Sequence, residues 1–480
     1  MKACISLLFV LVVATNGFSQ PKLAKDEQSL LSSLEAQYEN YSAIAHQIWN
    51  YAELGYQEEQ SSQLLQKTLS DAGFSMEVGV ADIPTAFVAS YGSGEPVVAL
   101  LAEFDALPGL SQTAAPRREV KEEGKAGHAC GHHLFGTGSV AAAIAVKEWM
   151  EKTDTQGTLR VYGTPAEEGG AGKVYMVRAG LFEDVDAALH WHPGDENNAD
   201  ARSSLSNKSA KFRFYGNAAH AAAAPEKGRS ALDGVEAMNM MVNMMREHVP
   251  SESRIHYVIT RGGEAPNIVP EFAEVFYYVR HPEMQSVREL FERVVKAAEG
   301  AALGTDTRME YEVIHGAYNL LPNETLSEKM YENLQAVGGV QYDEEEKAFA
   351  EQIRTTYDAG EATLASANEI KPYTVSHRGT GGSTDVGDVS WAAPTAGMRA
   401  ATWVPGTYAH SWQAVAAGGT SIGAKGMMVA AKTLSLTALD VFKNPKIAEE
   451  AQQELVQKRG DDFEYEALLG DRKPPLDYRD

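Results

Sequence analysis

The chain has 480 residues, of which 44% are hydrophobic and 22% are charged, and its formal net charge at pH 7 is −24. This length predicts two or three domains, each with an ordinary buried core. The negative charge disfavours binding to nucleic acid or to an anionic membrane surface, and no cluster of Lys and Arg reverses it locally.

The first residues predict export. An apolar run from Ile5 to Ala14 follows one lysine and precedes the small residues Gly17 and Ser19. About ten apolar residues are too few to span a bilayer, but they fit the core of a cleaved signal peptide. We therefore expect residues 1–19 to be removed, which leaves a periplasmic or secreted protein without a membrane anchor.

The following segment, residues 20–205, has the pattern of an α/β domain. Helical patterns over 31–52, 58–72 and 136–151 alternate with short buried strands such as PVVALLAEF. This alternation predicts a sheet with helices on both faces.

The stretch GHACGHHLFG contains Cys130, the cysteine that remains once Cys4 leaves with the signal peptide. It has no cysteine partner in its own chain, so its alternatives are a small buried side chain or a functional thiol. His128, His132 and His133 surround it, and thiolate with imidazole is a ligand set that suits zinc and similar ions. We therefore expect a metal site here.

Further metal-binding residue types follow other predicted strands. The strand TLRVYGTP leads into Glu167 and Glu168, a short strand from residue 186 runs into His190 and His192, and His410 lies in a later loop. Each feature alone has a plainer interpretation, such as a solvated helix start for the Glu pair. Together, Cys, His and Glu at strand ends are the residues of a two-metal hydrolytic centre.

The pattern over residues 206–316 predicts a separate unit that is inserted into the α/β domain. Residues 317–443 are then the second part of the α/β domain. The pattern of strand, helix, two strands, helix and strand is that of a ferredoxin-like fold. Residues 444–480 carry no recognisable chemistry and are interpreted as a peripheral helix and tail. The six inserted segments are KSAKFRFYG, Ser230 to Arg246, RIHYVIT, FAEVFYYV, Val287 to Leu303 and RMEYEVI.

Seven motifs in order resemble those of M20 family metallopeptidases, in the amidohydrolase branch of that family, over about residues 30–440. The resemblance implies a phosphorylase/hydrolase-like zinc-exopeptidase catalytic domain with an inserted lid and dimerisation domain. It also implies two divalent metal ions (Zn, Mn or Co) and hydrolysis of amide bonds in N-acyl-amino acids, dipeptide-like substrates or aminobenzoyl-glutamate. The motifs are GHACGHHLFGTGS, PAEEGGAGK, DAALHWHPG, GNAAHAAAAPEKGRSALD, GGEAPNIVP, GGSTDVGDVSW and TYAHSW.

The resemblance also implies roles for particular residues. The metal ligands would be Cys130, His132, Glu168, His192 and His410, with His190 as the alternative to His192. Glu167 would be the general base, standing off the metal within reach of a water molecule. The chain departs from the family pattern at His133, where relatives commonly carry Asp or Asn, and this leaves open which histidine coordinates.

In the predicted lid, the resemblance implies that His220 reaches a partner subunit's active site and steadies the oxyanion. Asn267 and Arg280 would contact the substrate, and a guanidinium can hold a carboxylate bidentately. A surface salt bridge is the alternative for Arg280. A homodimer formed through the lid, or a heteromer with a related subunit, is expected.

Two other functional classes stay open. One is a non-catalytic metal- or ligand-binding homologue, although a binding site has no need of a base such as Glu167. The other is a serine hydrolase using Ser139 or Ser383, but neither lies in a G-x-S-x-G turn.

Overall fold

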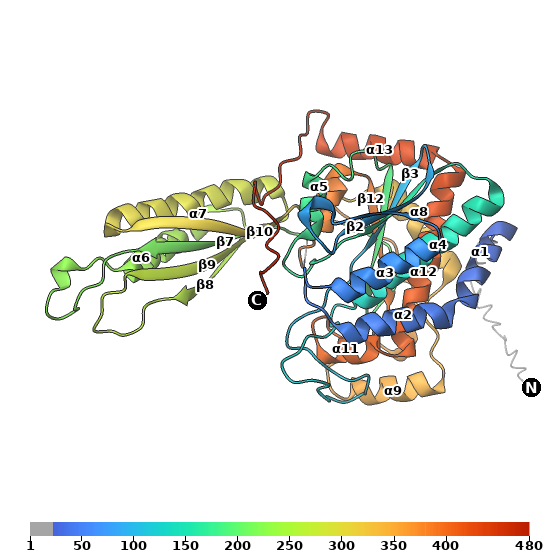
Figure 1. Ribbon diagram of the computed structural model, residues 1–480, viewed down its shortest axis with the longest axis horizontal. Coiled ribbons are helices and arrows are strands. Elements are labelled where there is room, and N and C mark those ends of the chain that lie inside the picture. Colours follow the sequence, from blue (N-terminus) through green and yellow to red (C-terminus); the bar gives the residue numbers. More distant parts are fainter. Residues whose placement is uncertain (1–22, 380, 480) are drawn as a thin grey trace, which may run out of the picture.

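The computed structural model describes residues 23–379 and 381–479. The predicted signal peptide, residues 1–19, lies outside this range. The described chain forms a larger α/β domain and a lid that extends away from it (Figure 1). No helix in the described ranges combines the length and apolar character needed to cross a bilayer.

The larger domain contains a six-stranded sheet in the order β1-β2-β4-β3-β5-β12. Strands β4, β3, β5 and β12 run parallel, while β1 and β2 form an antiparallel flank. The parallel strands therefore all end at one edge, where the residues that follow them gather. The bounds are β1 Ser75–Val78, β2 Phe87–Ser93, β3 Val97–Ala102, β4 Gly157–Gly163, β5 Ala187–Gly194 and β12 Thr395–Ala401.

Helices surround this sheet, and α4 and α12 pack against its central strands and against each other. A short parallel pair, β6 Ala201–Arg202 and β11 Val375–Ser376, lies apart from it. The helices are α1 Lys25–Ala36, α2 Tyr38–Tyr51, α3 Glu59–Asp71, α4 His132–Thr153, α5 Gly172–Arg178, α8 Glu324–Val337, α9 Glu344–Arg354, α10 Val386–Ala392, α11 Trp412–Gly418, α12 Ser421–Lys443 and α13 Lys446–Arg459.

Two predicted helix boundaries were wrong. The helix expected over 31–52 is two helices, because Gln37 leaves the helical conformation with φ −102° and ψ 9°. Helix α4 begins at His132, four residues before the predicted start at 136, because Gly131 adopts a left-handed φ of 79° and turns the chain directly into the helix. His132 therefore lies in the first turn of α4.

Small residues bring α4 very close to the sheet. A Cβ atom added at Gly136 would lie 2.7 Å from the backbone oxygen of Glu103, and one at Gly138 would lie 3.0 Å from the Trp191 ring. Real side chains do not fit at the first of these positions. The start of α4 is thereby held against the ends of β3 and β5.

The lid is a four-stranded antiparallel sheet in the order β10-β7-β9-β8, with α6 and α7 packed on it. It has its own hydrophobic core, which includes Phe212, Tyr277 and Phe291. The predicted fold class, an α/β domain with an inserted ferredoxin-like unit, is confirmed. The lid elements are β7 Ser206–Tyr215, α6 Ala231–Met245, β8 Arg254–Arg261, β9 Phe272–His281, α7 Met284–Thr305 and β10 Arg308–Ala317.

The chain after α13 is not peripheral, and this part of the sequence-based interpretation was wrong. It returns between the lid and the larger domain (Figure 1). Leu468 is buried in the lid core, whereas Ala467 and Leu469 are buried in the core of the larger domain. The segment is charged overall, but its few apolar side chains are buried in the two cores and thereby hold it between the domains.

Candidate metal centre

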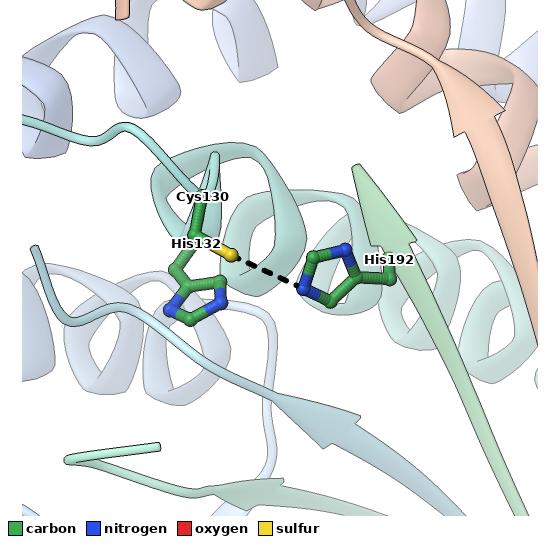
Figure 2. A group of neighbouring side chains, drawn as sticks. All are labelled: Cys130, His132 and His192. Carbon is green, nitrogen blue, oxygen red and sulfur yellow. Dashed lines mark hydrogen bonds between the residues drawn. The ribbon is translucent and has the colours of Figure 1, made fainter. Parts of the chain in front are cut away.

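The first group of side chains that could bind a metal ion comprises Cys130, His132 and His192. One ligand atom from each lies within 4.8 Å of the others. Figure 2 shows Cys130 and His132, at the start of α4, facing His192 on β5. The Cys130 Sγ atom lies 3.5 Å from His192 Nε2.

The second group comprises Cys130, Glu168 and His410, again with ligand atoms within 4.8 Å of one another. His410 has a left-handed φ of 59°, and its backbone N–H donates to Ala129 O over 3.0 Å, which holds it beside the cysteine. Cys130 belongs to both groups. A thiolate shared between two ligand sets is an arrangement that suits a pair of neighbouring cations.

The structure distinguishes the two histidines of β5. Both point to the same face, but the His190 ring packs over Gly397 of the neighbouring strand, where an added Cβ would lie 2.1 Å from His190 Nε2. His192 is the one that lies beside Cys130. His133 is also directed elsewhere, because its Nε2 lies 3.0 Å from Gly418 O.

Two carboxylates that the sequence analysis missed lie beside the His132 ring, and one of them, Asp105, is hydrogen-bonded to it. Asp105 Oδ1 lies 2.8 Å from His132 Nδ1, and Glu103 Oε2 lies 3.1 Å from His132 Nε2. A carboxylate on one ring nitrogen fixes the tautomer and directs the other nitrogen toward a metal. The signal was present in the sequence as Glu-x-Asp directly after β3.

Several buried polar atoms in this cluster lack a hydrogen-bond partner among the described residues. They are His132 Nε2, Glu103 Oε2 and Glu168 Oε1. The first two lie close to each other, and Glu168 Oε1 lies close to His410 Nε2, but neither pair has the geometry of a hydrogen bond. Leaving such atoms unsatisfied costs about 1–3 kcal/mol each. Burial raises the pKa of the Cys130 thiol above its usual range, so a thiolate here needs a neighbouring cation. The side chains therefore fit divalent metal ions.

Glu167 lies next to the ligand groups, in a third cluster with Glu103 and His132. Burial raises the pKa of its carboxyl well above the usual range, and the charges of Glu103 and Glu168 raise it further. A carboxyl that holds a proton more readily than usual can work as a general base and then as an acid.

A buried lysine, also missed from the sequence, offsets part of this negative charge. Lys173 Nζ lies 2.7 Å from Glu103 Oε1 and 2.7 Å from Asp385 Oδ1, and all three side chains are almost fully buried. Since an unpaired buried charge is very costly, the three groups must be kept together. Lys173 therefore ties the end of β3 to the loop before α10.

The structure does not bring His220 or Asn267 to the metal-binding groups of the same chain. Both are exposed, in loops joined by a bridge between His220 and Ile268 at the end of the lid far from the larger domain (Figure 1). The expected role of His220 in a partner's site stays a prediction. Arg280 lies at the opposite end of the lid sheet, paired with Asn207 of β7.

The surroundings of Arg280 differ from a surface salt bridge. It forms no ion pair with any residue in the described part of the chain, and its Nε atom is buried without a hydrogen-bond partner. Its guanidinium lies over the Tyr278 ring, 5.4 Å from the centroid. The donor groups of Arg280 are thus available for an anion.

Residues 99–414 match the family described as Peptidase family M20/M25/M40. The chain belongs to this family. The M20 chain is 43% identical over 447 residues to a subunit of p-aminobenzoyl-glutamate hydrolase from Escherichia coli (strain K12), with 88% of this chain and 93% of that protein covered. It is 30% identical over 432 residues to Xaa-Arg dipeptidase of Mus musculus, with 87% and 89% covered.

A solved structure shows the same fold. It is a dinuclear metal-binding peptidase of the M20 family from Bacillus subtilis, with a TM-score of 0.57 and 17% identity, and 85% of this chain and 99% of that one are covered. The predicted M20 membership and the similarity to aminobenzoyl-glutamate utilization protein B, suggested by the motifs DVGDVSW and HSWQ, are confirmed. Ser139, a candidate for a serine hydrolase, is fully buried inside α4 of this M20 chain.

Proposed function

We propose that this M20 chain hydrolyses the amide bond of small N-acylated amino acids or dipeptide-like molecules, with two divalent cations held by the two ligand groups. The observation that carries the proposal is the position of Cys130 in both groups, with Glu167 beside them. A non-catalytic binding protein would have no use for the Glu167 carboxyl.

Each ligand group would hold one cation. His132 and His192 with Cys130 would hold one cation, and Glu168 and His410 with the same thiolate would hold the other. When bound, such a pair lowers the pKa of a water molecule toward neutrality and polarises the scissile carbonyl. Zn, Mn and Co all accept the Cys, His and Glu ligands present here.

The remaining residues move protons and bind the substrate. Glu167 would take a proton from the attacking water and return it to the leaving nitrogen, a contribution of about 10²–10⁴-fold to the rate. Arg280, whose buried Nε has no partner among the described residues, would bind a substrate carboxylate. Asn267 lies at the far end of the lid beside His220, so it would contact a substrate in the active site of a partner chain. His220 would donate to the oxyanion in the active site of a partner chain.

The relatives support a choice of substrates. The E. coli relative is named as a subunit of p-aminobenzoyl-glutamate hydrolase, and the mouse relative is named Xaa-Arg dipeptidase. Both names describe molecules with an amide bond. We therefore propose aminobenzoyl-glutamate, other N-acyl-amino acids and dipeptides as the first substrates to test.

Assembly and location form a second part of the proposal. The name of the E. coli relative as one subunit of a hydrolase supports a heteromer with a related chain, and a homodimer through the lid is the alternative. Export to the periplasm or medium rests on the apolar run near the N-terminus. Mass measurement of the mature protein, and of any complex isolated with it, checks both.

The decisive experiment uses chelated protein to which Zn, Mn or Co is added back, assayed with aminobenzoyl-glutamate, N-acyl-amino acids and dipeptides. Hydrolysis should depend on added metal and should fall by about 10²-fold or more in Glu167→Gln, with metal content retained. Activity that survives complete metal removal, or an unchanged Glu167→Gln rate, would contradict the mechanism.

A further inference from the structure

The turn that carries Glu167 and Glu168 is strained, and side chains from other segments of the chain hold it in place. Ala166 has a φ of 59°, which is unfavourable for a residue with a side chain, so the turn needs support from its neighbours. Three hydrogen bonds give part of this support: Ala166 N to Glu58 Oε1 at 2.8 Å, Glu168 N to Asp105 Oδ2 at 2.9 Å, and the Tyr56 hydroxyl to Gly170 O at 2.7 Å.

The backbone carbonyl of Glu168 accepts hydrogen bonds from two residues of the C-terminal segment. The Tyr478 hydroxyl donates to Glu168 O over 3.1 Å, and the Arg479 guanidinium donates to the same oxygen. The Tyr478 ring also packs edge-on against Tyr56, 5.6 Å between centroids, so it braces the residue that holds Gly170.

Other contacts fix the course of this C-terminal segment. Arg472 donates to Ile314 O over 2.7 Å and to Glu312 Oε1 over 3.0 Å, both on β10 of the lid. Arg178 of the larger domain donates to the backbone oxygens of Gly470 and Arg472 over 2.6 and 2.8 Å. The segment is therefore anchored on both domains before it reaches Glu168.

We propose that Tyr478 and Arg479 are positioning residues for the Glu167–Glu168 turn. The inference rests on the proposed function, in which Glu168 binds a metal ion and Glu167 transfers the proton. Glu168 can bind the metal ion beside Glu167 only while its backbone keeps its orientation. Asp105 accepts from Glu168 N–H and so holds the peptide before Glu168, while Tyr478 and Arg479 donate to Glu168 O and hold the peptide after it. The direction of the Glu168 side chain is therefore fixed from both sides, and a displacement of about 1 Å can cost about 10²-fold in rate.

The test compares Arg479→Ala, Arg479→Lys and Tyr478→Phe in the full chain, with Lys473→Ala as the control. Lys473 is a cation of the same segment whose side chain does not bond the turn, so its loss removes an equal charge without disturbing Glu168. Tyr478→Phe keeps the ring packing and removes one donor. The measurements are kcat and KM, and metal affinity by competition with a chelator.

Arg479→Ala should lower kcat about 10–100-fold with KM within about twofold, and should weaken metal binding about tenfold or more. Arg479→Lys should recover part of both losses, because it restores a charged donor. A merely structural role would lower the melting temperature and leave the kcat and metal affinity of the folded protein unchanged, and that result would overturn the inference.

The metal measurement also separates this inference from the proposed function. If the wild-type protein hydrolyses none of the tested amides, the proposed function fails, while the metal affinities of Arg479→Ala and Lys473→Ala still test the positioning role. If the wild-type protein is active and Arg479→Ala matches Lys473→Ala in both measurements, the positioning role alone is rejected.

Discussion

His410 Nε2 lies 3.2 Å from Glu168 Oε1, so a loop after β12 meets the turn after β4 at the edge of the sheet. In the order of the sheet, β3 and β5 lie between these two strands, and each contributes its own residues to the same edge. The sheet topology therefore brings the candidate metal ligands together, and changes to single side chains can test whether they bind metal.

The two histidines of β5 provide a matched pair of variants. His192→Ala should lose tightly bound metal and should lower kcat/KM by about 10²-fold or more, because it removes the proposed ligand that lies beside Cys130. His190→Ala, on the same face of the strand, should keep its metal content. Elemental analysis after dialysis checks both, and a larger loss of metal from His190→Ala would reverse the assignment.

Asp105→Asn should weaken metal binding without removing a ligand. The carboxylate fixes the His132 ring from 2.8 Å, and loss of such a partner typically costs about 10–100-fold in metal affinity or activity. Chelator competition measures the affinity. An unchanged dissociation constant would show that His132 is oriented by its packing alone.

Arg280→Ala should raise KM about 10–100-fold for substrates with a free carboxylate and should change kcat less. The reason is the loss of a charge-assisted hydrogen bond between the guanidinium and the substrate. The same substrates with the carboxylate blocked as an amide serve as controls. An equal effect of the variant on both substrate forms would rule out carboxylate recognition.

Asp388 should make stability depend on pH. It is buried in α10, where it accepts hydrogen bonds from the Tyr465 hydroxyl and Tyr318 N–H, and burial raises its pKa to about 7. In the unfolded chain its pKa is about 4. Between these values the folded state holds the proton and the unfolded state does not, so stability falls as pH rises from about 4 to about 7 and is level above that range.

Asp388→Asn removes this titration. Between pH 5 and pH 7 the wild-type protein should lose about 2 kcal/mol of unfolding free energy relative to the variant. Melting temperatures of both proteins at the two pH values measure the change. The lost hydrogen bond changes the unfolding free energy of the variant by the same amount at both pH values. If the difference in unfolding free energy between the two proteins is equal at pH 5 and pH 7, Asp388 is already ionised at pH 5.

Much of the site could be predicted because its residues follow strands. Cys130, Glu168, His192 and His410 stand out as reactive side chains after apolar runs, and parallel strands bring such positions together. The choice between His190 and His192 could not be made from the strand alone, since both share one face. The structure separates them, because Gly397 on the neighbouring strand makes room for the His190 ring while His192 lies beside Cys130.

The parts that escaped prediction depend on contacts without a local pattern. Lys173 pairs with Asp385, which is 212 residues away in the sequence, and their separate surroundings give no sign of a partner. Arg479 bonds a backbone oxygen, which every residue possesses, so no side-chain motif marks the target. The charge of the C-terminal segment is therefore typical of solvent-exposed chain, and only the structure shows that its apolar residues are buried.

The distance along the chain between the two ligand groups has a consequence for biosynthesis. A growing polypeptide contains the Cys130, His132 and His192 set long before it reaches His410, and the Glu168 carbonyl gains Arg479 later still, 311 residues after Glu168 itself. A chain that has not yet reached His410 lacks a member of the second group. Since the proposed reaction needs both groups, we expect no hydrolysis from a nascent chain before His410 has been added and folded into place.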